Sequence, residues 1–160
     1  MRKTINCFIP YEENTAIDKV VTALKDSIVV NKIYLLTTAH GSMPSVPAGC
    51  DPFTIDSLNS SDTIKKIAQK ADTPFTLLYT KASPFELGYM ALERIADFLQ
   101  DRKTGMVYAD HYEWKEGEKK KHPAIDYQPG SVRDDFDFGA LLAFRSEYLI
   151  GAAGMMENER

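Results

Sequence analysis

The sequence predicts an α/β fold in which helices cover both faces of a mostly parallel central sheet, forming a three-layer sandwich. Short apolar runs alternate along the chain with amphipathic segments about a dozen residues long, which is typical of βαβ units. Right-handed crossovers between parallel strands then place helices on both faces of the sheet. With 160 residues the chain is long enough to bury a core, so we expect residues 1–160 to form a single domain.

The first βαβ unit is expected within the first quarter of the chain. Residues 5–9, INCFI, predict a short strand that Pro10 closes. Apolar positions recur at helical spacing over residues 14–27, where Asn14 is a suitable N-cap. Residues 31–38, NKIYLLTT, are almost continuously apolar, as expected of a strand that is covered on both faces.

The alternation of strands and helices continues through the middle of the chain. Residues 52–55 predict a short strand, and residues 60–72 predict a helix with Ser60 or Ser61 as its N-cap. An apolar strand over residues 75–79 follows. These segments extend the predicted parallel sheet by two strands and one crossover helix.

The pattern changes after the strand that ends at Tyr79. Pro84 is expected to open an amphipathic helix that runs through Gln100, since proline is favoured in the first turn of a helix. Further along, we expect a strand at 105–110, a polar two-stranded excursion over 111–123 that turns at Glu116–Gly117, and a strand at 139–144 followed by a helix.

Composition restricts the classes of function. The formal net charge of −4 argues against a general nucleic-acid binder, which would usually be basic. No apolar run approaches the roughly 20 residues that span a bilayer, and the N-terminus does not resemble a signal peptide, so a cytoplasmic location is expected. Cys7 and Cys50 do not form a disulfide framework, and Cys7 is expected to be a buried small hydrophobe. Self-association is left open.

Several motifs that would identify an enzyme class are absent from the sequence. There is no G-x-x-x-x-G-K-[ST] loop, no G-x-G-x-x-G after the first strand, and no G-x-S-x-G elbow. His40, His111 and His122 are scattered, without the spacing to Cys, His or Glu that a zinc site needs. A hydrolase or a dehydrogenase therefore has little support.

Four sequence segments, taken in their order along the chain, are similar to a known protein family. The segments are NCFIPYEEN, NKIYLLTTAHGS, FTLLYTKASPFELGYMALERI, and MVYADHYEWKEGEKKKHPAIDYQPGS followed by FDFGALLAFRSEYLIGAAGM. In this order and spacing they resemble the N-terminal, nucleotide-binding part of a family 2 glycosyltransferase of the GT-A type, including hypothetical Bacteroides-type members. The resemblance implies a GT-A, Rossmann-like fold and binding of a UDP- or GDP-sugar at the carboxyl ends of the strands.

The resemblance also implies roles at the first two strand ends. Pro10, Tyr11 and Asn14 would line the nucleotide base. Thr37 and Thr38 stand where the family usually has paired acids that contact the base and the ribose.

The fourth strand end departs from the family pattern. Tyr79, Thr80 and Lys81 stand where the family has Asp-x-Asp, whose carboxylates hold a divalent ion against the diphosphate. Without that motif, dependence on Mg²⁺ or Mn²⁺ is doubtful, and Thr80 and Lys81 would face the diphosphate directly. The alternative is that Lys81 is a solvated lysine in a site that has lost its chemistry.

Acidic side chains are the candidates for catalysis. Asp110, Asp135 and Asp137 would face the sugar or the acceptor. Strand alternation would place Asp135 and Asp137 on the face opposite Phe136 and Phe138. The alternatives are a turn-initiating role for Asp110 and an exposed strand edge for the acidic group that Asp134, Asp135 and Asp137 form.

The leading hypothesis is transfer of a hexosyl or N-acetylhexosaminyl group to a glycan, a lipid-linked acceptor or a protein. The alternative is a non-catalytic nucleotide-sugar-binding or scaffold module. Nucleotidyl transfer is disfavoured, because the first strand lacks a Gly-rich loop bearing Lys or Arg. Family members are longer, so we expect the N-terminal, donor-binding part of a longer protein, with Met155 and Met156 in an apolar docking patch.

Overall fold

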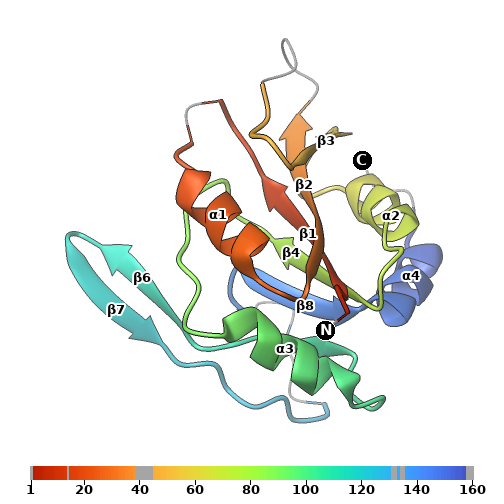
Figure 1. Cartoon of the computed structure of the whole chain (residues 1–160). Coiled ribbons are helices and arrows are strands. Elements are labelled where there is room, and N and C mark those ends of the chain that lie inside the picture. The colour runs from red at the N-terminus through yellow and green to blue at the C-terminus, as the bar shows by residue number, and fades with distance from the viewer. Residues whose placement is uncertain (1, 14, 39–44, 131–132, 134–135, 158–160) are drawn as a thin grey trace.

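The computed structural model describes residues 2–13, 15–38, 45–130, 133 and 136–157 (Figure 1). Within these residues, six strands form one sheet in the order β3-β2-β1-β4-β8-β5, and β6 and β7 form a separate ribbon. The strands are β1 (Ile5–Pro10), β2 (Val30–Thr38), β3 (Asp51–Ile55), β4 (Phe75–Tyr79), β5 (Met106–Val107), β6 (His111–Lys115), β7 (Glu118–His122) and β8 (Leu141–Arg145). The helices are α1 (Asp18–Asp26), α2 (Ser61–Gln69), α3 (Ala91–Gln100) and α4 (Ser146–Met155).

The central sheet is mixed but mostly parallel, which confirms the predicted fold class. β1 pairs in parallel with β2 and β4, and β2 pairs in parallel with β3. β8 lies between β4 and β5 and is antiparallel to both. Every residue of β1 is buried, as expected of a central strand covered on both faces.

Helices cover both faces of the sheet and produce the expected three layers (Figure 1). One core lies under α1 and α3 and the other lies under α2 and α4. The first contains Ile5, Cys7, Ile9, Val20, Leu24, Leu92 and Leu99, and the second contains Phe8, Leu36, Leu78, Ile67 and Leu149. Cys7 is fully buried as predicted, and burial raises the pKa of its thiol.

The first two helices follow the sequence pattern with one shift. α2 begins after Ser60, whose side chain accepts a hydrogen bond from the backbone N–H of Thr63, so Ser60 is the expected N-cap. α1 begins at Asp18, later than expected, and Ile17 occupies its N-cap position. Asn14, the residue expected to cap this helix, lies outside the described residues.

The prediction that Pro84 opens the third helix is wrong. α3 begins at Ala91, preceded by Met90 in the left-handed region with a φ of 49°. Residues 80–90 instead form an irregular segment, in which the ring centroids of Phe85 and Tyr79 lie 4.2 Å apart. Packing of the partly buried Phe85 on Tyr79 offsets the local preference for helix, so tertiary packing delays the first turn.

The predicted strand over residues 105–110 is shorter in the structure, since β5 contains only Met106 and Val107. Tyr108 and Asp110 leave the sheet to contact the segment that follows β7. The hydroxyl of Tyr108 donates to the carbonyl of Ile125 at 2.7 Å, and a carboxylate oxygen of Asp110 accepts from the N–H of Ala124 at 2.6 Å. These contacts replace further sheet pairing.

The polar ribbon of β6 and β7 forms as predicted. Glu116 and Gly117 both have positive φ, at 54° and 81°, which is the geometry of a two-residue type I′ turn. In Figure 1 the ribbon projects from the side of the domain, beside α3 and away from β2 and β3.

Exposed apolar side chains lie on the last helix and just beyond it. Tyr148, Ile150 and Met155 are exposed on α4, and Met156 is 39% exposed just beyond it. The docking patch expected around Met155 and Met156 stays a prediction. Among the described residues, no helix has both the length and the apolar character needed to cross a bilayer.

Candidate functional site

The sheet contains a topological switch point between β1 and β4. From β1 the chain adds β2 and then β3 on one side, and it then returns to place β4 on the other side of β1. Ligands of open α/β sheets bind outside the carboxyl ends of the strands at such a point. Here Pro10 ends β1 and Tyr11 follows it, and Thr80 and Lys81 follow β4.

The β1–β2 side of this edge is formed by uncharged residues. Pro10 is buried at the end of β1 and pairs with Leu36, and Thr37 is 4% exposed. The parallel register therefore brings Tyr11 level with Thr37, and Thr38 is exposed one residue further on. Of the residues predicted to contact the base or the ribose, Tyr11 and Thr38 are accessible, whereas Pro10 and Thr37 are in the sheet.

Tyr11 is anchored at the edge through both its backbone and its side chain. Its N–H donates to the carbonyl of Leu36 at 2.8 Å, and its hydroxyl donates to the carbonyl of Ser45 at 3.3 Å. Its ring is partly buried against the core under α1 and α3. Asn14, which was predicted to line the base with Tyr11, lies outside the described residues.

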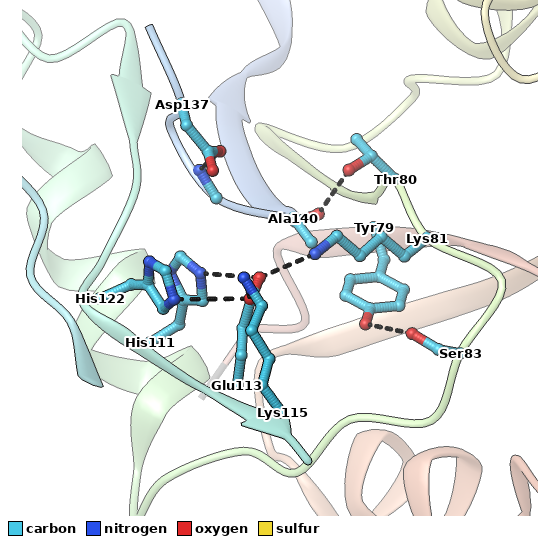
Figure 2. A network of polar contacts seen from close by, with 11 residues as sticks. Tyr79, Thr80, Lys81, Ser83, His111, Glu113, Lys115, His122, Asp137 and Ala140 are labelled. Carbon is cyan, nitrogen blue, oxygen red and sulfur yellow. Dashed lines mark hydrogen bonds and ion pairs between the residues drawn. The ribbon is translucent and has the colours of Figure 1, made fainter. Parts of the chain in front are cut away.

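The β4 side of the edge is connected to β8 and to the ribbon (Figure 2). The N–H and the hydroxyl of Thr80 both donate to the carbonyl of Ala140, at 2.9 and 3.2 Å, which holds the start of β8 beside the end of β4. The ammonium of Lys81 turns toward β6 and lies 3.0 Å from a carboxylate oxygen of Glu113. Lys81 is therefore an ion-paired side chain, although 52% of it remains exposed.

Glu113 is the centre of this polar network. One carboxylate oxygen faces Lys81 and lies 3.6 Å from Nε2 of His111. The other lies 3.1 Å from Nζ of Lys115 and 3.4 Å from Nε2 of His122. Hydrogen bonds from Lys81 and then Lys115 lower the pKa of the Glu113 carboxyl to about 2, and the hydrogen bond to Glu113 raises the pKa of Lys81.

Sequence reasoning missed this network because it treated the histidines as scattered. His111 and His122 are cross-strand partners, and their rings stack with centroids 5.2 Å apart and planes 10° from parallel. The signal was present in the sequence, because a two-residue turn at Glu116–Gly117 necessarily pairs residue 111 with residue 122. The same register places Glu113 on the face of the ribbon that carries both rings.

A cleft of about 340 Å³ lies beside the network. Its wall combines aromatic rings with polar groups. The lining residues are Ala109, His111, His122, Pro123, Ala124, Ile125, Arg133, Phe136, Asp137 and Phe138. Such a wall can contact both the flat faces and the hydroxyl groups of a polar ring-shaped ligand.

The predicted catalytic acids have structural contacts in this region. Asp137 lines the cleft, and one of its carboxylate oxygens accepts from the N–H of Gly139 at 2.8 Å. Asp110 binds the N–H of Ala124, and its other oxygen lies 3.6 Å from Nζ of Lys121. Asp110 therefore links the residue before β6 to the segment after β7. Asp135 lies outside the described residues.

The strand expected at 139–144 begins at Leu141, and residues 136–138, which include Asp137, have no regular structure. The alternation of side chains nevertheless survives. Asp137 is exposed, whereas the rings of Phe136 and Phe138 lie 4.5 Å apart and both contact Tyr108 edge-on. Packing on Tyr108, rather than pairing with another strand, keeps the two phenylalanines together.

The carboxylates of the site are dispersed. Among the described residues, no group of three or more His, Cys, Asp or Glu side chains is placed to hold a metal ion. The network around Glu113 instead brings two ammonium groups to one carboxylate. Its chemistry is suited to anions, since two lysines exceed the charge of a single Glu.

Comparison with known proteins supports the fold. No family model matches the chain, and no curated protein matches it. A solved structure, CMP:2-keto-3-deoxy-manno-octonic acid synthetase complexed with CTP, aligns with a TM-score of 0.51 at 9% sequence identity. The alignment covers 99% of this chain and 80% of that one. The two share a fold. The likeness extends to the fold alone and agrees with the predicted α/β architecture around a mostly parallel sheet.

Proposed function

We propose that this chain is a glycosyltransferase-like domain that binds a nucleotide-sugar donor, UDP- or GDP-linked, at the switch point between β1 and β4. The observation that carries the proposal is the position of Lys81, whose ammonium extends from the carboxyl end of β4 at this point. The fold likeness to an enzyme whose structure contains CTP supports a nucleotide at this edge.

The donor would extend along the edge from one side to the other. Tyr11 and Thr38 are the accessible groups for the base and the ribose. Thr80 and Lys81 would meet the diphosphate, and the sugar would reach toward the cleft that Asp137 lines. To bind, the diphosphate would compete with Glu113 for Lys81, an exchange that a half-exposed ion pair permits at low cost.

Transfer of the sugar requires a base that deprotonates the acceptor hydroxyl. The two described candidates, Asp110 and Asp137, each already accept a backbone hydrogen bond. These contacts favour the alternative, a non-catalytic nucleotide-sugar-binding module, over transfer by these two acids. Hexosyl or N-acetylhexosaminyl transfer to a glycan, a lipid-linked acceptor or a protein would then need Asp135 or a group beyond this chain.

Nucleotidyl transfer is a second candidate activity, since the similar solved structure is a synthetase that binds CTP. The segment after β1, residues 11–17, contains Glu12 and Glu13 and has no Gly, Lys or Arg. A triphosphate carries more negative charge than a diphosphate and needs more cationic partners. We therefore place nucleotide sugars before nucleoside triphosphates.

Calorimetry with UDP, GDP and CTP tests the proposal. We expect UDP or GDP to bind more tightly than CTP. Lys81→Ala should weaken binding of the diphosphate roughly ten- to hundredfold, as loss of a charge-assisted hydrogen bond does, and should leave binding of uridine or guanosine unchanged.

Lys70→Ala is the matched control, because Lys70 is an exposed lysine at the end of α2, on the amino side of the sheet. It removes the same charge and should leave nucleotide affinity unchanged. Absence of binding of all three nucleotides at millimolar concentration would refute the proposal. Transfer of sugar by the chain alone would decide for the enzyme over the binding module.

A further inference from the structure

The ribbon of β6 and β7 has two chemically different faces. Successive side chains of a strand point to opposite sides, and cross-strand partners share a side. Tyr112 pairs with Lys121 and Trp114 pairs with Lys119, so these four residues form one face, here called the aromatic–lysine face. His111, Glu113 and His122 belong to the other face.

The histidine face of the ribbon is turned toward the body of the protein (Figure 2). Glu113 meets Lys81 from the end of β4. His111 packs on Gly139, where an added Cβ would lie 3.1 Å from Nδ1 of the imidazole. The aromatic–lysine face must therefore point away from the sheet, and the ribbon presents it on a projecting arm (Figure 1).

The two aromatic side chains of the aromatic–lysine face are largely exposed to solvent. Trp114, which is the single tryptophan of the sequence, is 73% exposed, and Tyr112 is 56% exposed. Large aromatic side chains contribute most of their stabilisation when they are buried. An exposed Trp and Tyr side by side on a projecting element therefore indicate a surface that is covered by a partner.

The charge of this face is positive. Nζ of Lys119 lies 4.6 Å from the centroid of the Tyr112 ring, and Lys121 is 55% exposed beside Asp110. Within residues 111–122, the acids lie elsewhere, because Glu113 and Glu118 belong to the other face and Glu116 is in the turn. The face thus combines two amphipathic rings with two lysines, of which Lys121 is also ion-paired with Asp110.

We propose that the aromatic–lysine face docks on an anionic phospholipid surface. Trp and Tyr rings favour the headgroup region of a bilayer, and lysines extend their charge to anionic headgroups while their stems remain in apolar contact. A projecting ribbon can reach a flat bilayer without a cleft. A nucleic-acid strand would instead need a positively charged groove along its backbone, and the chain has a net charge of −4. This inference is independent of the nucleotide site.

Tryptophan fluorescence tests the inference directly, because the emission comes from Trp114 alone. We expect a blue shift when vesicles of phosphatidylglycerol and phosphatidylcholine are added to the full chain, and no shift with phosphatidylcholine alone. High salt should reverse the shift, since screening weakens the attraction of the lysines. An unchanged spectrum with anionic vesicles, or an equal shift with neutral ones, overturns the inference.

Charge-matched variants locate the binding surface. Lys119→Gln combined with Lys121→Gln should weaken partitioning to anionic vesicles roughly thirtyfold, measured by co-sedimentation. Lys3→Gln combined with Lys19→Gln removes the same charge from exposed positions elsewhere and should leave partitioning unchanged. Trp114→Ala should also lose co-sedimentation while its circular dichroism stays that of the parent.

The fluorescence assay also separates other partners of an aromatic surface. A shift of the Trp114 emission with single-stranded DNA or with an oligosaccharide, in the absence of any response to vesicles, would overturn the inference and assign the face to that ligand. Equal loss of vesicle binding in the two double-lysine variants would likewise overturn it, because binding would then depend on net charge rather than on this face.

Discussion

The two sides of the carboxyl edge of the sheet are held by different forces. On the β1–β2 side, Pro10 and Thr37 are buried and backbone pairing between adjacent strands sets the geometry. On the β4 side, the geometry of Lys81 depends on Glu113, which is 32 residues away in sequence and lies on a projecting ribbon. Burial stabilises the first side, and charge pairing organises the second.

This difference predicts different consequences of mutation. Burial of apolar side chains is the main source of stability, whereas exposed ion pairs contribute little. Changes under the β1–β4 sheet should therefore unfold the protein, whereas changes in the Glu113 network should alter what Lys81 binds and leave the fold intact.

The largest expected effect is on the buried side. Leu77 is fully buried in β4, next to β1, so Leu77→Ala should lower the free energy of unfolding by about 2–5 kcal/mol. Urea denaturation measures it. Glu113→Ala in the same assay should cause a much smaller loss, and comparable losses in the two variants would remove the distinction between the two sides.

A smaller effect is expected where the ribbon contacts the body. Gly139→Ala places a Cβ 3.1 Å from His111 at a φ of +83°, and Gly130→Ala has the same unfavourable φ, +80°, with open space around it. Both should lose roughly 1 kcal/mol to backbone strain. A larger loss for Gly139→Ala, measured by urea denaturation, would come from the displaced imidazole, whereas equal losses would show that this contact does not hold the ribbon.

Glu113→Gln should increase affinity for UDP or GDP. The variant removes the carboxylate that competes for Lys81, and loss of one exposed ion pair corresponds to a gain of up to roughly fivefold. Calorimetry at low salt gives the measurement. Weaker binding by the variant would mean that Glu113 positions Lys81 for the ligand rather than competing with it.

The stability difference between the parent and Glu113→Gln should depend on pH. The pKa of Glu113 is lowered to about 2 in the folded chain, so its contribution is complete above the ordinary Glu pKa and is lost as the pH falls toward 2. Urea denaturation of both proteins at several values between pH 6 and pH 2 should show the small advantage of the parent decreasing through this range. An advantage that is constant with pH would contradict the network.

The smallest expected effect concerns divalent ions. Lys81 stands where the resembled family has an acidic metal-binding motif, so chelation should leave nucleotide affinity unchanged. Calorimetry with EDTA and with added Mn²⁺ checks this. Loss of binding in EDTA would point to a metal held elsewhere, and Asp137→Asn should then reproduce the loss.

Local sequence accounts for most of the sheet because the determinants of each strand are its own side chains. The apolar run of β2 and the Ser60 cap of α2 require no knowledge of distant residues. The predicted start of α3 was wrong because it depends on a contact outside the helix. Phe85 packs on Tyr79 and displaces the first turn that was expected at Pro84. Strand β5 was shortened in the same way, by contacts of Tyr108 and Asp110 outside the sheet.

By itself the sequence determined the α/β architecture, the carboxyl edge and the turn of the ribbon at Glu116–Gly117, because periodicity and turn chemistry are local properties. The partner of Lys81 was decided by folding. A solvated lysine and an ion-paired one have the same sequence signal, and only the attachment of the ribbon to β4 brings Glu113 within 3.0 Å. Such a contact depends on the relative position of two elements, which hydrophobic patterning leaves unspecified once both are at the surface.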